Sequence, residues 1–169
     1  MKTVIEESKI KTADNTVKIN LVHPDQVPFI WGQVEKWLDK GAKHIREYYQ
    51  NEHLYNAIMT GQIQLWISHR QSKIRTIMLT QLDYYPECIQ FRYLYLGGEI
   101  GSFKEIVSAW DMVNKWAIAH GATKSCIIGR DGWEKKLAKF GYHKKSVMLV
   151  KDLFTLAKTN GNSHEIWRQ

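Results

Sequence analysis

A glycine-rich segment near the middle of the chain has the pattern of an anion-binding turn. It reads LGGEIGS over residues 96–102, follows an alternating aromatic run, and precedes a helical pattern that begins at Phe103. Backbone N–H groups at such a turn and at a helix N-terminus attract phosphate, because they point partial positive charge at it. The same pattern also occurs where a chain only changes direction. The candidate phosphate-binding residues here are Gly97, Gly98, Gly101 and Ser102.

Carboxylates at the ends of expected strands are candidates for a general base, which must accept a proton from a reacting group. Asp83, Glu87 and Glu99 have such positions, and Glu87 and Glu99 are the catalytic candidates. Each of them is also typical of an exposed turn or cap. Glu99 in addition places a negative charge in the glycine turn, where it opposes a bound diphosphate. The histidines next to turns (His23, His69 and His120) have no evident nucleophile partner, and no metal-binding spacing is present.

The chain is basic, with 24 Lys and Arg against 17 Asp and Glu and a formal net charge of +7. Most of these residues are scattered, which favours a solvated surface over a dedicated binding face. Contact with nucleic-acid phosphates stays open as an alternative. Cys88 and Cys126 lie in apolar runs and are expected to be buried free thiols. The lysines that could contact phosphates are Lys135, Lys136, Lys139, Lys144 and Lys145.

Hydrophobic periodicity alternates between the spacing of helices and that of strands. Three strand-like runs joined by short polar connections predict an antiparallel meander. A helix and a strand after them predict a parallel crossover, so the sheet is expected to be mixed. Asp25 is the expected cap of the first helix. The expected elements are a strand at 17–22, helices at 25–41 and 45–60, strands at 63–68, 74–85 and 88–96, a helix at 103–120, a short buried strand at 124–129, a short helix within 132–142 and a last strand at 145–153.

The expected organisation is a polar N-terminal arm at 1–16, a single domain at 17–154 and a polar C-terminal tail at 155–169. The first residues, MKTVIEESK, lack the apolar segment of a signal peptide. The apolar runs are too short to cross a membrane. These patterns predict a protein that is neither secreted nor membrane-spanning.

Two stretches carry a resemblance to a known family. They are YLYLGGE at 93–99 and the segment at 109–153, which includes GRDGWEKKLAKFGY at 129–142. Together with the element order, they resemble the GCN5-related N-acetyltransferase (GNAT) fold. More narrowly, they resemble GNAT-like proteins of tailed bacteriophages, some of them internal virion proteins. The resemblance implies an α+β, GNAT-like (acyl-CoA N-acyltransferase) fold, with a mixed central sheet and helices on both faces.

The resemblance also implies a site, from which this sequence departs. Enzymes of the family bind the diphosphate of acetyl-CoA with a loop of the form Q/R-x-x-G-x-G/A. Here Arg92 lies five residues before Gly97, inside the strand, and no Arg or Gln has the expected spacing. Arg130, in a later loop, is a further candidate for binding a phosphate. Many family members use a tyrosine as the acid that protonates the leaving thiolate, and Leu137 stands at that position.

These departures favour a non-catalytic phage protein, acting as a virion component or an assembly factor. Its expected partners are phage structural proteins or copies of itself, and its expected location is the host cytoplasm or the virion. The alternative is an N-acyltransferase that moves the acetyl group of acetyl-CoA to an amine. In that case acetyl-CoA is the only cofactor expected.

Overall fold

The computed structural model describes residues 18–70, 73–129, 132–146 and 148–150. The chain divides into two compact units, Met1–Gly129 and Arg130–Gln169. The boundaries expected at residues 16 and 154 lie outside the described residues. Within the described residues, no helix combines the length and the apolar character needed to cross a membrane.

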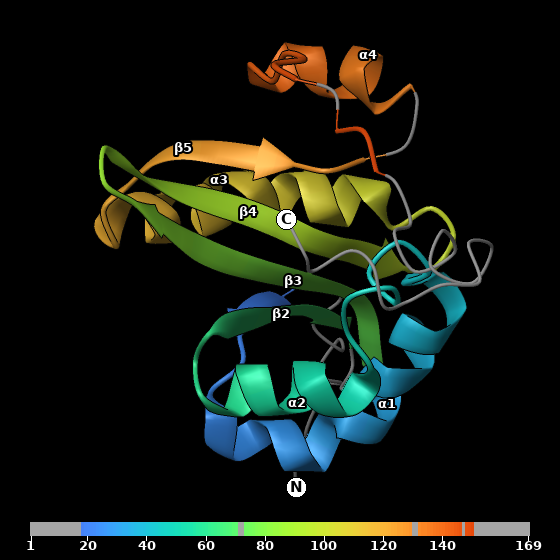
Figure 1. The fold of residues 1–169 in the computed structure, drawn as a ribbon. Coiled ribbons are helices and arrows are strands. Elements are labelled where there is room, and N and C mark those ends of the chain that lie inside the picture. The colour runs from blue at the N-terminus through green and yellow to red at the C-terminus, as the bar shows by residue number, and fades with distance from the viewer. Residues whose placement is uncertain (1–17, 71–72, 130–131, 147, 151–169) are drawn as a thin grey trace, which may run out of the picture. The chain divides into compact units, whose positions relative to one another are not determined.

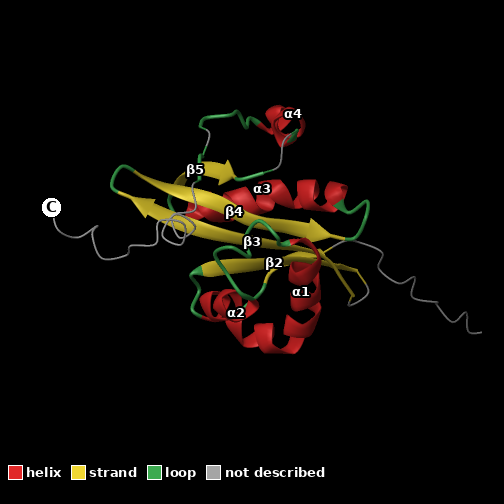
Figure 2. Cartoon of the chain, turned by 45° about the vertical axis from the view of Figure 1, so that its right-hand side comes forward, coloured by secondary structure: helices red, strands yellow, loops and turns green. Residues whose placement is uncertain are grey.

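The first unit is built on a five-stranded mixed sheet (Figures 1 and 2). Its strands stand in sequence order, from β1 to β5. The first four are antiparallel neighbours, whereas β5 runs parallel to β4. The predicted meander and parallel crossover are therefore confirmed. The strands are β1 (Lys18–Leu21), β2 (Ile63–Arg70), β3 (Lys73–Tyr85), β4 (Cys88–Gly98) and β5 (Ala122–Ile127).

Helices cover both faces of this sheet, as predicted. α1 (Val27–Gly41) and α2 (Asn51–Met59) lie on one face, and α3 (Phe103–Ala119) lies on the other (Figure 2). α3 connects β4 to β5, which is the crossover that a parallel strand pair requires. The helix is followed by its C-cap, His120, and by Gly121, whose φ of +85° is readily adopted only by glycine.

Two helix starts differ from the prediction. α2 begins at Asn51 rather than at residue 45, because Gln50 and His53 form a reciprocal capping box. The Gln50 N–H donates to His53 Nδ1 at 3.2 Å. Asp25 does not cap α1. It lies in the short 3₁₀ helix η1 (Pro24–Gln26), where its own N–H donates to the His23 ring at 3.3 Å.

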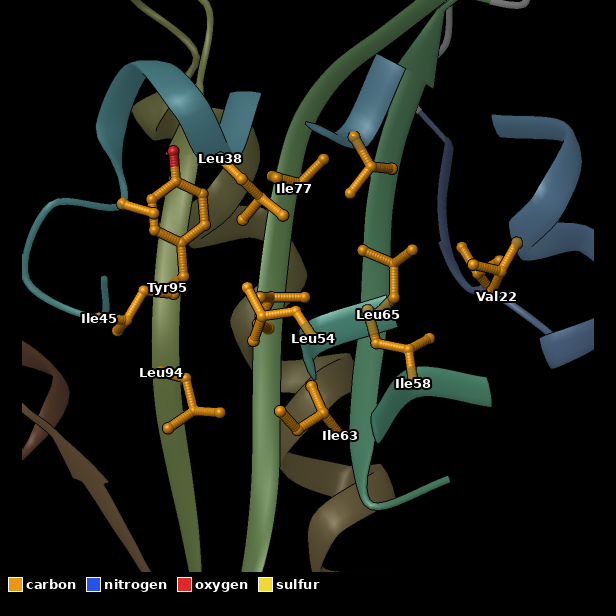
Figure 3. Packing of buried hydrophobic residues seen from close by; sticks show 14 of the residues in the cluster. Val22, Leu38, Ile45, Leu54, Ile58, Ile63, Leu65, Ile77, Leu94 and Tyr95 are labelled. Atoms are coloured by element: carbon orange, nitrogen blue, oxygen red, sulfur yellow. The ribbon is translucent and has the colours of Figure 1, made fainter. Parts of the chain in front are cut away.

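The main core lies between the helix pair and the sheet (Figure 3). Side chains from α1, α2 and the central strands are excluded from water there because they form the apolar faces of those elements. On the opposite face, aromatic rings fill the space under α3, with Tyr93 and Trp110 centred 5.0 Å apart. The fully buried aliphatic residues of the main core include Val34, Leu38, Leu54, Leu65, Ile77 and Leu79.

β5 is more exposed than predicted. Its central residues, Thr123 to Ser125, are exposed, because it forms one edge of the described sheet. The thiols of Cys88 and Cys126 are free, as predicted, but only partly buried. Burial still raises the pKa of Cys126 above its ordinary value, against the opposing charge of Arg92.

The second unit contains α4 (Trp133–Leu137) followed by the 3₁₀ helix η2 (Ala138–Phe140). The short helix expected here is confirmed, and Gly141 ends it with a φ of +83°. The strand expected at 145–153 is absent from its described residues, and Met148, Leu149 and Val150 are exposed. Strand propensity largely reflects how well a side chain packs against neighbouring strands. These three side chains are exposed instead, so their propensity does not produce a strand here.

Replacing Leu54 with alanine tests the main core. Leu54 is fully buried between α2 and the sheet, so the L54A substitution should lower the free energy of unfolding by about 2–5 kcal/mol. Urea denaturation measures the change. Ile118 on α3 is 68% exposed, and I118A should stay within about 0.5 kcal/mol of wild type. Equal effects of the two substitutions would contradict this core.

Candidate functional site

β4 separates from β5 halfway along its length. The pairing of the two strands ends at Tyr93 and Ile127, whereas β4 continues to Gly98. In the described part of the chain, residues 94–98 therefore have no partner strand on this side. Five residues of strand span roughly 16 Å. Such an edge presents main-chain N–H and C=O groups that can pair with another extended chain.

A β-bulge lies where the two strands separate. Tyr93 pairs with Thr80 and Tyr95 pairs with Leu79, which leaves Leu94 as the extra residue. A bulge bends its strand and increases the local twist, so it helps to turn β4 away from β5. The carbonyl oxygen of Leu94 lies 3.0 Å from Nε2 of His44, in the connection between α1 and α2. The bulge is therefore held by a side chain from outside the sheet.

Tyr95 fixes α1 to β4 beside this bulge. Its hydroxyl donates to the carbonyl oxygen of Trp37 at 2.9 Å, and its ring stacks on His44 with centroids 6.2 Å apart. Burial raises the pKa of Tyr95, so the hydroxyl remains a donor. A Cβ at Gly97 would overlap the ring, and one at Gly41 would lie 2.6 Å from the hydroxyl. Gly97 is thus required for packing Tyr95, a role that its place in the sequence did not indicate.

The rest of the glycine segment forms a tight turn against β3. The Glu99 N–H donates to the Arg75 carbonyl at 2.9 Å, and the Ser102 N–H donates to the Glu99 carbonyl at 3.0 Å. A Cβ at Gly98 would lie 2.8 Å from that same Arg75 oxygen. Gly101 has a φ of +86°. The turn delivers the chain into α3, whose first N–H groups lack acceptors within the helix.

Glu99 is paired with two cations from β3. Lys73 Nζ lies 2.9 Å from one carboxylate oxygen, and Arg75 Nη1 lies 3.3 Å from the other. The hydrogen bond from Lys73, followed by the charges of Lys73 and Arg75, holds the pKa of Glu99 below its ordinary value. The negative charge expected to repel a diphosphate is therefore compensated, and the three side chains together carry +1. Sequence reasoning missed both cations, since Lys73 and Arg75 precede Glu99 by 26 and 24 positions.

The two base candidates lie at opposite ends of β4. Glu99 follows its last residue, whereas Glu87 is exposed in the turn before its first. The 11 residues between them span roughly 35 Å, so the two carboxylates do not belong to one site. Asp83, the third carboxylate considered, is paired with Arg92 at 2.8 Å. The base roles of Glu87 and Glu99 stay predictions.

The structure brings three of the remaining sequence candidates together in one turn. Gly98, Gly101 and Ser102 share the turn before α3, and Ser102 is buried. Arg130 lies outside the described residues. Leu137 is buried in the second unit, and an aliphatic side chain there cannot donate a proton. Among the residues described, no cluster of His, Cys, Asp and Glu could hold a metal ion.

Adding a methyl group at Gly97 tests the packing of Tyr95. G97A should lower the free energy of unfolding by about 1–3 kcal/mol, because the new Cβ overlaps the Tyr95 ring. Chemical denaturation measures the change. A Cβ at Gly32 in α1 would meet no heavy atom within 4 Å, so G32A should instead stabilise the protein by about 0.5–1 kcal/mol. A G97A protein as stable as wild type would show that the ring lies elsewhere.

The ion pairs of Glu99 predict a pH-dependent stability. The folded-state pKa is below the ordinary value of 4.5, so the pairs stabilise the protein above that value. The contribution disappears as the pH falls through the folded-state pKa. The Tm difference between wild type and E99Q should thus be largest at pH 7 and shrink toward pH 3. Exposed Glu47 supplies the control E47Q, and an E99Q difference that is independent of pH would contradict the pairing.

Comparisons with known proteins agree with this architecture. No family model matches the sequence, and no curated protein matches it. Among solved structures, a predicted acetyltransferase from Clostridium acetobutylicum with acetyl-CoA is 11% identical and has a TM-score of 0.63, with 83% of this chain and 98% of that chain covered. A GCN5-related N-acetyltransferase from Ralstonia eutropha is 10% identical and also has a TM-score of 0.63, with 81% and 99% covered.

A third similar structure is glucosamine-6-phosphate N-acetyltransferase from Arabidopsis thaliana, with 10% identity, a TM-score of 0.60, and 82% and 99% of the two chains covered. At such identities the likeness shows the fold alone. Nothing in these comparisons supports the narrower resemblance to phage proteins. The strand order, the helices on both faces and these structural neighbours together establish the fold class. The chain has the GNAT, or acyl-CoA N-acyltransferase, fold.

Proposed function

We propose that this chain binds acetyl-CoA along the open edge of β4 and transfers the acetyl group to an amine. The observation that carries the proposal is the unpaired edge at residues 94–98, which leads directly to the glycine turn and the N-terminus of α3. The pantetheine arm of coenzyme A is extended and contains two amide groups. It can therefore pair with a strand edge in the way that an added peptide strand does.

The diphosphate group is assigned to the turn and the first N–H groups of α3. A helix N-terminus favours negative charge, and the backbone of Gly101 and Ser102 leads directly into it. The cation missing from the loop is supplied by Lys73 and Arg75 on β3. A diphosphate carries more charge than one carboxylate, so it can compete with Glu99 for these side chains. Arg130 stays a further candidate for a phosphate contact.

Acetyl-CoA supplies an activated acetyl thioester, and the protein must position it and receive a proton from the attacking amine. The neighbour solved with acetyl-CoA supports this choice of ligand. Glu87 and Glu99 remain the base candidates from the sequence. Glu99 is already paired with Lys73 and Arg75, and Glu87 lies at the far end of β4, so neither adjoins the bulge at Leu94.

One observation still favours a non-catalytic role as a virion component or assembly factor. Leu137 stands at the position where the resemblance implies a tyrosine acid. Absence of that acid does not remove acetyl transfer, since a thiolate can take its proton from water. Contact with nucleic acid through the exposed lysines of the second unit also stays a prediction. We favour the acyltransferase, because the site geometry and the structural neighbours point to the same ligand.

Calorimetric titration with acetyl-CoA tests the binding site. At a hundred times its Kd, the ligand should stabilise the protein by about 2.7 kcal/mol. The double variant K73Q/R75Q should bind more weakly by roughly 1.5–3 kcal/mol, since charge-assisted hydrogen bonds to the phosphates are lost. E99Q should bind more tightly, because a competing anion is removed.

K115Q is the matched control for charge, because Lys115 is exposed on α3, twelve residues or roughly 18 Å along the helix from its first residue, Phe103. It should leave the affinity unchanged. No heat and no Tm shift at millimolar acetyl-CoA would refute the proposed function. Tight binding without acetyl transfer to any amine would instead favour the non-catalytic role.

A further inference from the structure

His44 lies at the position where β4 leaves β5, although its residue type and its spacing in the sequence do not by themselves indicate a role. It lies in the connection between α1 and α2, and its Nε2 atom is 3.0 Å from the carbonyl oxygen of the bulge residue Leu94. Its ring stacks on Tyr95, with an angle of 20° between the planes. The residue is nevertheless exposed, so part of the ring faces solvent.

The hydrogen bond determines which ring nitrogen is free. A carbonyl oxygen can only accept, so Nε2 must carry the hydrogen when it binds Leu94. In the neutral ring, Nδ1 then has a lone pair and no hydrogen. Stacking on Tyr95 fixes the plane of the ring, and Tyr95 is itself held by Trp37. The result is an oriented imidazole with one basic nitrogen.

The proposed binding mode brings the reacting carbon to this imidazole. The arm of acetyl-CoA would start at the glycine turn and run back along residues 98 to 94. It must stop where β5 occupies the edge, which is at Tyr93. The thioester at the end of the arm then lies beside the bulge. Leu94, whose carbonyl binds His44, is the extra residue of that bulge.

We infer that His44 is the general base of the proposed acetyl transfer, a conclusion that rests on the proposed function. Nδ1 takes a proton from the acceptor amine, and the nitrogen lone pair forms a C–N bond with the thioester carbon. The C–S bond breaks, and the thiolate of coenzyme A leaves and takes a proton from water. The imidazolium returns its proton to solvent. An amide and free coenzyme A are the products.

The surroundings of His44 are compatible with this role. The titratable group that faces it from β4 is Tyr95, which burial keeps protonated. The charged residues of its own connection and of the end of α1 include one ion pair, between Asp39 and Arg46. The others are Lys40, Lys43 and Glu47, and all three are exposed.

The H44Q substitution separates the base from the structural contact. A glutamine amide can still donate to the Leu94 carbonyl, but it has no basic nitrogen. The control is H53Q, which removes another exposed histidine nine residues away and can keep an acceptor for the Gln50 N–H. Release of the coenzyme A thiol is followed with ethanolamine, spermidine and lysine methyl ester as amine probes. Acetyl-CoA affinity is measured in parallel by calorimetry.

We expect H44Q to bind acetyl-CoA within twofold of wild type and to lose about 10²–10⁴-fold in kcat. Any loss of wild-type rate that comes from protonation of Nδ1 should be absent from the pH profile of H44Q. H53Q should match wild type. Nitrogen-15 spectra of the free protein should show His44 hydrogenated at Nε2, and its Nδ1 signal should shift when acetyl-CoA is added.

An H44Q variant with wild-type kcat, or a His44 ring hydrogenated at Nδ1 in its neutral form, would overturn the assignment while leaving the acetyl-CoA site intact. Failure of the wild-type protein to bind acetyl-CoA is a different result. It would remove the proposed function, and the role of His44 as a base would fall with it.

Discussion

The contact between Tyr95 and the end of α1 is the constraint on which the site depends. One aromatic side chain ties the bulged part of β4 to a helix on the face of the sheet, through a hydrogen bond to Trp37 and a stacked His44. The ring needs space that only glycine leaves at positions 41 and 97. Because this contact fixes the connection between α1 and α2, it also fixes the imidazole beside Leu94. Packing and proposed chemistry thus share the same few residues.

The glycine turn carries nearby positive charge, although its loop sequence differs from the diphosphate-binding pattern that the resemblance implies. Two cations from β3 approach the turn from the neighbouring strand and are held there by Glu99. A paired carboxylate of this kind keeps the cations in place in the free protein. In the proposed function, the diphosphate would replace Glu99 as the partner of Lys73 and Arg75, so binding would exchange one set of ion pairs for another rather than create isolated charge.

Much of the fold could be predicted from the sequence, because periodicity records which face of an element is buried. The meander from β2 to β4 and the long helix α3 are clear examples. The bulge could not be predicted, because Tyr93, Leu94 and Tyr95 are all large and largely apolar. The alternation of polar and apolar residues therefore gives no sign of the extra residue. The partners of Glu99 and the contact of His44 depend on tertiary pairing between distant segments. The late start of α2 depends on a local capping box, and strand propensity at 145–153 was not matched by a strand in its described residues.

The proposed function requires that the edge of β4 beyond Tyr93 binds an extended ligand that contains amide groups. Hydrogen exchange of the backbone amides tests this requirement, because it reports protection residue by residue. With saturating acetyl-CoA, we predict slower exchange at those amides of residues 94–98 that do not pair with β3, and at the first turn of α3. Exchange rates at both places that are unchanged by the ligand, with β3 and β5 equally unaffected, would contradict binding along this edge.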